Sequence, residues 1–451
     1  MFKKSLSILL VLVVMISLVL VGCGQTTEQN DGGETDNAKQ AEDKQAEDKQ
    51  PEKAKITMTS WLEVEQSVEA IFKEMIDAFR SANPDIEVET IGLPFNQYKD
   101  QLLVMSTSGN APDVVMGNSQ MMVGFNGAGI LAPLEDLISK EKQADIFDNN
   151  LAGGTFDGKL VAIPWITHPI GLFYNKELFE KAGLDPEKAP ETWDEMVQAA
   201  KKVAALKQDK DGNRIYGIGH SIGKVAHAGS VFNGIIYSHG GHFLDAEGKV
   251  DFDNAGTREA MQYIKDMVDA GVMPAGVNQK EIRGLFANEQ LGIMFDGDMG
   301  RAVFRKLSGK GKEFDKIMGV ALIPTGKTGK SETVYTEHQL GIAKESNDQE
   351  AAAKLIEHLL SKEMIVRYHE TNSVLAPSKS IGKLPEMNED YYMEVFNKQL
   401  ERARPLPATH PMFDNAMLEV TKALERVSVG KEDVDPVVKE TQQKIESLYS
   451  K

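Results

Sequence analysis

The sequence predicts an α/β fold built from two compact lobes. The chain has 451 residues, which exceeds one ordinary domain, so domain-size statistics favour two compact units. Apolar residues make up 41% and charged residues 26% of the chain, a composition typical of globular proteins. Short β-type runs alternate with amphipathic segments through much of the body, which indicates helices layered over a largely parallel sheet.

The chain begins with a segment typical of export signals. Lys3 and Lys4 form a basic start, and an almost unbroken apolar run follows them. That run ends in Leu-Val-Gly-Cys, which resembles the lipobox of bacterial lipoproteins, where the cysteine is diacylated and the signal is cut before it. An ordinary signal peptide or an uncleaved membrane anchor is the alternative. We therefore expect residues 1–22 to be a lipoprotein signal peptide and lipidated Cys23 to anchor the protein to the outer face of the cell membrane.

A polar segment follows the cysteine. Residues 24–54 contain no Val, Ile, Leu, Met or aromatic residue, and Gln-Ala-Glu-Asp-Lys occurs twice, at 40–44 and 45–49. Such a segment cannot bury enough apolar surface to offset the entropy lost on ordering. We expect residues 23–54 to be the lipidated cysteine and a disordered tether, able to span roughly 30 Å.

The composition also limits the partners of the chain. The net charge of −18 argues against nucleic acid as a partner and against membrane binding through a basic segment. Cys23 is the one cysteine of the sequence, so neither an intramolecular disulfide nor a cysteine-based metal site can form.

The first elements of the body alternate strand and helix. The β-type run at 56–61 precedes a helical pattern at 68–79, which Asn83-Pro84 stops. Residues 86–91 alternate as a strand, a helix ends at Gly109, and 113–116 is a third strand. Ligands of such sheets bind beyond the carboxyl ends of the strands. The loops that follow Trp61 and Met116 are therefore expected at the rim of a cleft.

Later segments continue the pattern. Thr192 to Glu195 reads as the capping box of a helix in which Trp193 faces the core. The apolar runs at 291–295 and 319–323 are typical of buried strands, and the chain is mostly helical from Asp348 onward.

Several segments together resemble family 1 extracellular solute-binding proteins, the maltose-binding-protein-like group. The resemblance covers about residues 55–345, and its most specific stretch is 158–195. The segments that carry it are FRSANPDIEV (79–88), SGNAPDV (108–114), GKLVAIP (158–164), LFYNKELF (172–179), KAGL (181–184), ETWDE (191–195) and GGHFLD (240–245).

The resemblance implies two lobes joined by several chain crossovers, with a ligand between them. It implies an N-terminal lobe of residues 55–166 plus about 295–338, and a C-terminal lobe of about 167–294 plus 339–451. Crossovers are expected near 165–170, 291–296 and 337–342. A monomer without cofactor would bind a sugar or oligosaccharide by hinge closure and deliver it to the permease of an ABC importer, without acting as an enzyme.

Sugar sites combine flat apolar rings with polar groups that hydrogen-bond to hydroxyls. Trp61 and Trp165 are the ring candidates, with a packing role as the alternative for each. Phe413 is a weaker ring candidate from the C-terminal lobe. The polar candidates lie at the predicted strand ends and on the crossovers, with solvated surface charge as the alternative for each carboxylate. They are Glu63, Glu65, Asn118, Ser119, Gln120, His168, Asp296 and Asp298.

Two other functions stay open at this point. Asp296 and Asp298 could form the acid pair of a glycoside hydrolase, although the sequence has no His-Glu-x-x-His motif. A receptor for a metal or another small polar solute is the other alternative, because four histidines lie close in sequence: His220, His227, His239 and His242.

Overall fold

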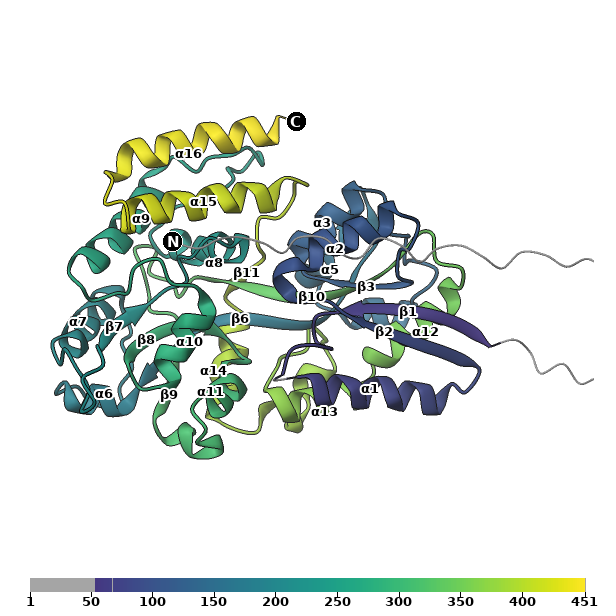
Figure 1. Cartoon of the computed structure of the whole chain (residues 1–451), viewed down its shortest axis with the longest axis horizontal. Coiled ribbons are helices and arrows are strands. Elements are labelled where there is room, and N and C mark those ends of the chain that lie inside the picture. Colours follow the sequence, from purple (N-terminus) through teal and green to yellow (C-terminus); the bar gives the residue numbers. More distant parts are fainter. Residues whose placement is uncertain (1–52, 67, 451) are drawn as a thin grey trace, which may run out of the picture. The chain divides into compact units, whose positions relative to one another are not determined.

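The computed structural model describes residues 53–66 and 68–450 (Figure 1). The predicted signal peptide, Cys23 and almost all of the predicted tether lie outside these residues. The described residues belong to one compact unit. No helix in the described part of the chain has both the length and the apolar character needed to cross a bilayer.

Nine of the described strands form one mixed sheet. Its main path runs β2-β1-β3-β10-β6-β8-β7, with β9 paired to β6 and β11 paired to β10. β1 is parallel to β2 and β3, whereas β10 is antiparallel to both β3 and β6. The strands are β1 (Ala54–Ser60), β2 (Ile86–Gly92), β3 (Val114–Gly117), β6 (Ile163–Asn175), β7 (Tyr216–Gly219), β8 (Leu291–Gly297), β9 (Met318–Ala321), β10 (Thr333–Ile342) and β11 (Ala403–Arg404); β4 (Thr155–Phe156) and β5 (Lys159–Leu160) form a separate pair.

The first lobe surrounds strands β1, β2 and β3. The predicted apolar face of α1 is buried against them, and α1 ends before Pro84, as the sequence predicts. Tertiary burial of one amphipathic face stabilises such a helix more than intrinsic propensity does. The helices of this lobe are α1 (Glu69–Ala82), α2 (Phe95–Thr107), α3 (Ser119–Gly127), α4 (Lys140–Asp145), α5 (Asp148–Ala152), α12 (Gln349–Leu359) and α13 (Lys362–Asn372).

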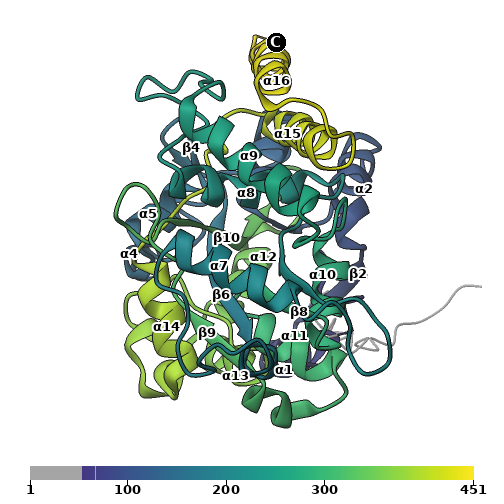
Figure 2. The ribbon, with the colours of Figure 1, turned by 90° about the vertical axis from the view of Figure 1, so that its left-hand side faces the viewer.

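The second lobe surrounds β7, β8, β9 and the second half of β6. Its strands lie between α8 and α9 on one side and α11 and α14 on the other (Figure 2). Thr192 caps α7 by accepting a hydrogen bond from the Glu195 amide, as predicted, but the Glu195 carboxylate accepts from Glu191 instead of Thr192. The helices are α6 (Lys176–Lys181), α7 (Trp193–Ala204), α8 (Ala226–Ser238), α9 (Ala255–Asp269), α10 (Gln279–Ala287), α11 (Gly300–Leu307), α14 (Tyr391–Leu400), α15 (Phe413–Ser428) and α16 (Val434–Tyr449), with short 3₁₀ turns at Gly311–Lys316, Ile381–Lys383 and Pro385–Asn388.

Two strands run through both lobes. Residues 163–169 of β6 pair with β10 and residues 170–175 pair with β8 and β9. β10 pairs with β11 at its start and with β3 at its end. These two strands agree with the crossovers expected near 165–170 and 337–342.

The core residues divide the chain differently from the predicted lobe boundaries. Residues 340–374 pack in the core of the first lobe, whereas most of 295–338 packs with the second. β8 pairs with β6 and β7 inside the second lobe and is not a crossover. The chain passes back from the first lobe to the second near Leu375. Val374 packs in the core of the first lobe, and Leu375 packs in a core cluster of the second. An apolar run indicates a buried strand but does not show which strands it pairs with.

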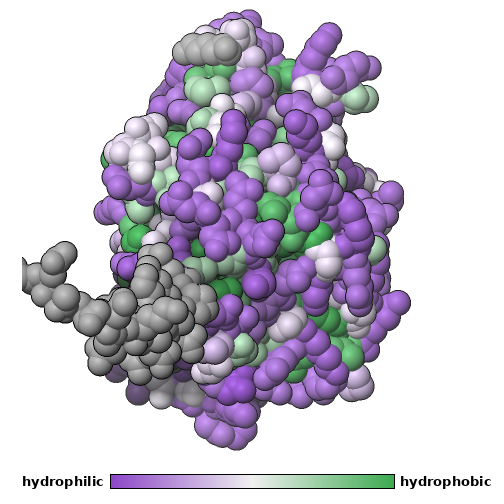
Figure 3. Space-filling view, turned by 90° about the vertical axis from the view of Figure 1, so that its right-hand side faces the viewer, coloured by the Kyte–Doolittle hydropathy of each residue, from purple (hydrophilic) through white to green (hydrophobic). Residues whose placement is uncertain are grey.

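The outer face of the first lobe is mainly hydrophilic, with small, separate apolar areas (Figure 3). A mainly hydrophilic face with scattered apolar residues is typical of a surface in contact with water.

Candidate functional site

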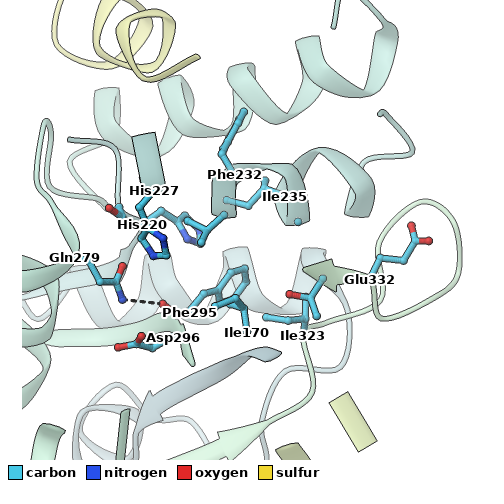
Figure 4. Close-up of a pocket in the computed structure, with 14 residues that line it drawn as sticks. Ile170, His220, His227, Phe232, Ile235, Gln279, Phe295, Asp296, Ile323 and Glu332 are labelled. Carbon is cyan, nitrogen blue, oxygen red and sulfur yellow. Dashed lines mark hydrogen bonds between the residues drawn. The ribbon is translucent and has the colours of Figure 1, made fainter. Parts of the chain in front are cut away.

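A cavity lies at the carboxyl ends of two strands in the second lobe. β7 leads into His220 and Ser221, and β8 places Phe295 and Asp296 beside them (Figure 4). This is the sheet edge at which α/β proteins bind ligands. The cavity has a volume of about 530 Å³, including space open to solvent. Half of the residues that line it are polar or charged: His220, Ser221, His227, Gln279, Asp296, Glu332 and Thr333. The other half are Ile170, Val231, Phe232, Gly234, Ile235, Phe295 and Ile323.

The two histidines that line this cavity are uncharged at neutral pH. Burial lowers the pKa of His220 to about 3, and burial together with the charge of Arg283 lowers the pKa of His227 to about 4. The Nε2 atom of His220 lies 3.0 Å from the Tyr263 hydroxyl. Neutral imidazoles offer one donor and one acceptor each, so they can bind polar groups without requiring a charge on the ligand.

Asp296 is held by an arginine of the second lobe. Arg283 on α10 donates from Nε at 2.7 Å and from Nη2 at 2.8 Å to the two carboxylate oxygens. The amide of Gly297 also donates to Asp296, at 2.8 Å. A bidentate pair of this kind is both strong and geometrically fixed.

The first lobe meets the second beside this cavity. The ring of Phe95 on α2 lies 6.4 Å from that of His227, which lines the cavity. Nearby, the Gln120 amide donates to the Ser230 hydroxyl on α8. These contacts join α2 and α3 of the first lobe to α8 of the second.

Five rings form what we call the aromatic cluster: Trp61, Trp165, His168, His338 and Tyr368. Trp61 meets Phe95 and His338 edge-on, at 5.3 and 5.0 Å between ring centroids. Trp165 stacks on Tyr368 at 5.5 Å, and His168 lies 4.8 Å from His338. Trp61 is 3% exposed and Trp165 is 0% exposed, so both belong to the first core as well as to the lobe boundary.

Several polar atoms of the aromatic cluster have no protein partner. Within residues 53–66 and 68–450, Trp165 Nε1, His168 Nε2, His338 Nδ1 and the Tyr368 hydroxyl are buried and make no hydrogen bond. Burial keeps the pKa of His338 well below its ordinary value, so its imidazole is neutral. Buried polar groups in proteins are nearly always paired, which makes this group a candidate for contact with a polar ligand.

His168 and Asp298 lie together, as residues of β6 and of the loop after β8. The distance from His168 Nδ1 to Asp298 Oδ1 is 2.6 Å. The Leu375 amide donates to the other oxygen of Asp298 at 2.7 Å, and the Met299 amide donates to Oδ1 at 2.9 Å. Asp298 therefore connects two segments where the chain passes between the lobes.

Glu65 faces the second lobe from the loop after β1. Burial raises its pKa, and the charges of Arg283 and His168 oppose this rise. Glu63, by contrast, packs its aliphatic carbons near Gly92. Of the two predicted carboxylates, the structure brings Glu65 to the site.

The three polar residues after β3 have mainly structural contacts. Asn118 caps α3 by accepting from the Met121 amide at 2.9 Å, and Gln120 joins the lobes as described. The Ser119 hydroxyl donates to Glu337 at 2.8 Å. Asn150 and Gln339 also donate to Glu337, at 3.1 and 2.6 Å.

Glu337 → Gln is expected to weaken the dependence of folding stability on pH. Burial raises the pKa of Glu337 to about 7, although three hydrogen bonds oppose the rise. The folded state therefore holds a proton between pH 4.5 and 7 that the unfolded state releases, so stability decreases as pH rises through this window. The expected loss is about 3 kcal/mol. Thermal melts from pH 5 to pH 8 should show a smaller decrease in Tm for the variant; equal decreases would contradict the assignment.

Phe413 is not placed as the sequence predicts. Phe413 is the first residue of α15, and its ring is fully buried in the core of the second lobe. The centroid of this ring lies 5.8 Å from that of Phe243. It therefore serves packing and is not grouped with the aromatic cluster. Trp193 packs in the same core, as predicted, and its ring also meets Phe295 of the cavity edge-on at 5.9 Å.

The four histidines near 220–242 do not gather around one point. His239 bonds the carbonyl of Ile235, and His242 pairs with Asp251, whereas His220 bonds Tyr263. No group of three or more metal-binding side chains occurs among the residues that the structure describes. The alternative of a metal receptor gains no support from this geometry.

Sequence reasoning missed several residues of the site. Arg283 lies on a helix whose pattern gives no functional signal, and Tyr368 lies in the weakly matched C-terminal region. His338 stands beside Glu337 within the predicted crossover, which could have indicated both.

Comparison with known proteins identifies a matching family, similar sequences and similar solved structures. Residues 63–365 match the family model described as bacterial extracellular solute-binding protein. The arabinooligosaccharide-binding protein of Bacillus subtilis is 25% identical over 296 residues, which cover 64% of this chain and 60% of that protein. The structure of maltose-bound MalE3 from T. maritima has a TM-score of 0.76 and 25% identity, covering 88% of this chain and 100% of that one. A solute-binding protein of Thermotoga lettingae bound with alpha-D-tagatose has a TM-score of 0.78 and 24% identity, with coverage of 88% and 100%.

Proposed function

Because the chain belongs to the bacterial extracellular solute-binding proteins, we propose that it binds a sugar or oligosaccharide between its lobes and delivers it to an ABC importer. The observation that carries this proposal is the aromatic cluster at the lobe boundary, which combines stacked rings with four buried polar atoms that have no partner among the described residues. Rings cover the apolar faces of sugars, and neutral donors and acceptors bind their hydroxyls. The relatives named for arabinooligosaccharide, maltose and tagatose support the same ligand class.

In this proposal, closure of the two lobes around the ligand is what allows the permease to recognise the loaded protein. A ligand that contacts both the aromatic cluster and the cavity favours the closed form by its differential contacts. The closed form would then dock on the membrane permease. Binding leaves the sugar chemically unchanged in this proposal. The contacts of Asp296 with Arg283 and of Asp298 with His168 occupy both carboxylates, which argues against a glycosidase pair.

A panel of neutral sugars tests the function. Maltotriose, arabinotriose and galactotriose are added to the purified protein in thermal melts and calorimetric titrations. A bound sugar at 100 times its Kd should add roughly 2.7 kcal/mol to the free energy of unfolding. At least one sugar should bind and be recovered intact after hours. Binding of none would contradict the ligand class, and a new hydrolysis product would favour the glycoside hydrolase.

Trp61 → Ala is expected to weaken binding of the best sugar in the panel by roughly ten- to a hundredfold, because one ring contributes about 1–3 kcal/mol to contact with a sugar. The variant should also lose stability, since the ring is buried. Phe79 → Ala is the matched control: Phe79 is buried in the same core against His358. It should lose stability while its folded fraction keeps full affinity. If both variants keep full affinity, Trp61 is purely a core residue.

We further propose that Cys23 carries the lipid that anchors the protein to the membrane. The support is the basic start, the apolar run and the Leu-Val-Gly-Cys sequence that precede a strongly polar segment. Cys23 → Ser should abolish incorporation of a fatty-acid analogue in metabolic labelling and shift the protein out of the membrane fraction. Equal labelling of the variant and the unaltered protein would show that the cysteine is not the lipid attachment site.

A further inference from the structure

We propose that this site selects sugars by charge: it accepts uncharged rings and rejects sugars that carry a carboxylate, and Asp296 determines this specificity. The inference rests on the proposed function and narrows its ligand class. It follows from the distribution of charges around the cavity and from the way Arg283 is bonded.

The two carboxylates that line the cavity are already paired with arginines that do not line it, Asp296 with Arg283 and Glu332 with Arg404. The described residues that line the cavity include no Lys or Arg. His220 and His227 add no positive charge at neutral pH because burial lowers the pKa of each. A carboxylate that entered this cavity would lose hydration, and the described lining offers no unpaired cation to compensate for that loss.

Arg283 is the guanidinium that a ligand carboxylate could use, but Asp296 already occupies it. The bonds from Nε and Nη2 to the two oxygens of Asp296, at 2.7 and 2.8 Å, use the fork that recognises a carboxylate. Glu65 of the first lobe adds a second negative charge close to Arg283. The arginine therefore balances protein carboxylates and offers little attraction to an anionic ligand.

Asp296 → Asn tests this directly, since it keeps the shape of the side chain and removes the carboxylate that pairs with Arg283, which leaves Glu65 as the nearby negative charge. Each neutral sugar of the panel is compared by calorimetry at pH 7 with its derivative in which the primary hydroxyls are oxidised to carboxylates. The unaltered protein should bind the oxidised form at least ~100-fold more weakly than the neutral parent. In the variant this ratio should fall by at least ~tenfold.

Asp315 → Asn is the matched control. Asp315 forms a similar bidentate pair with Arg305 between α11 and the following turn, and neither residue lines the cavity. The control makes the same change in net charge but should leave the ratio unchanged. If Asp296 → Asn does not fold, Glu65 → Gln replaces it, with Glu63 → Gln as its control and an expected threefold or larger fall in the ratio.

The outcomes separate the two proposals. Failure of all neutral sugars to bind would contradict the proposed function. Binding of a neutral sugar and its oxidised derivative with equal affinity would overturn charge selection alone. An equal change of the ratio in Asp296 → Asn and Asp315 → Asn would show that net charge, and not the bonding of Arg283, sets the preference.

Discussion

Trp165 → Ala is expected to remove about 3–5 kcal/mol of folding stability, the usual cost of deleting a large ring from a packed core. Trp165 is 0% exposed, stacks on Tyr368 of α13 and lies on β6, which joins the two lobes. Its loss removes apolar contacts and leaves a cavity beside the chain segment that crosses between the lobes. Urea unfolding should show a lower midpoint with a similar slope.

Trp165 → Phe is the control for this experiment. It keeps a ring that can stack on Tyr368, so its loss of stability should be clearly smaller than that of the alanine variant. The affinity of the folded alanine variant for a bound sugar should also fall, because Trp165 Nε1 is one of the buried atoms without a protein partner. If Trp165 → Ala lowers the free energy of unfolding by less than about 1 kcal/mol, the surrounding core has filled the space left by the ring, and the ring is not needed for stability.

Asp298 → Ala is expected to cost about 3 kcal/mol, because it removes the acceptor shared by several buried groups. The side chain is fully buried and accepts hydrogen bonds from the Leu375 and Met299 amides as well as lying 2.6 Å from His168 Nδ1. Alanine would leave these buried groups without an acceptor. Because His168 and Leu375 belong to two crossing segments, the variant should also close less firmly on a ligand.

Asp315 → Ala is the comparison for Asp298. It breaks an ion pair whose two partners are more exposed than Asp298, so the expected cost is about 1 kcal/mol or less. Urea unfolding measures both variants, and limited proteolysis with and without sugar measures closure. Equal losses in the two variants would show that the position of Asp298 between the crossing segments has no special importance.

The sequence predicted the parts of this protein that depend on local pattern. The apolar spacing from 68 to 79 and the stop at Asn83-Pro84 predicted α1, because one buried face and a proline determine where such a helix lies. Alternation predicted β2, and Thr192 predicted the cap of α7. The family was also recognisable, because its motifs are short, ordered segments that need no knowledge of distant contacts.

The candidate site was predicted only in part. His168, Asp298, Asp296, Trp61 and Trp165 do lie at or beside the lobe boundary, as positions at strand ends should. The same reasoning could not distinguish a rim ring from a core ring, because strand position does not reveal burial. It also proposed Phe413, whose ring packs in the second core.

The sequence by itself determined the α/β class, the main helices and strands, and the family. Only the tertiary structure decided which strands pair, so it placed β8 inside the second lobe and the return of the chain near Leu375. It also brought Arg283 to Asp296, His338 to Trp61 and Tyr368 to Trp165, from segments far apart in the chain. Local patterns arise from the geometry of one helix or strand, whereas pairing, burial and charge compensation arise from packing between distant segments.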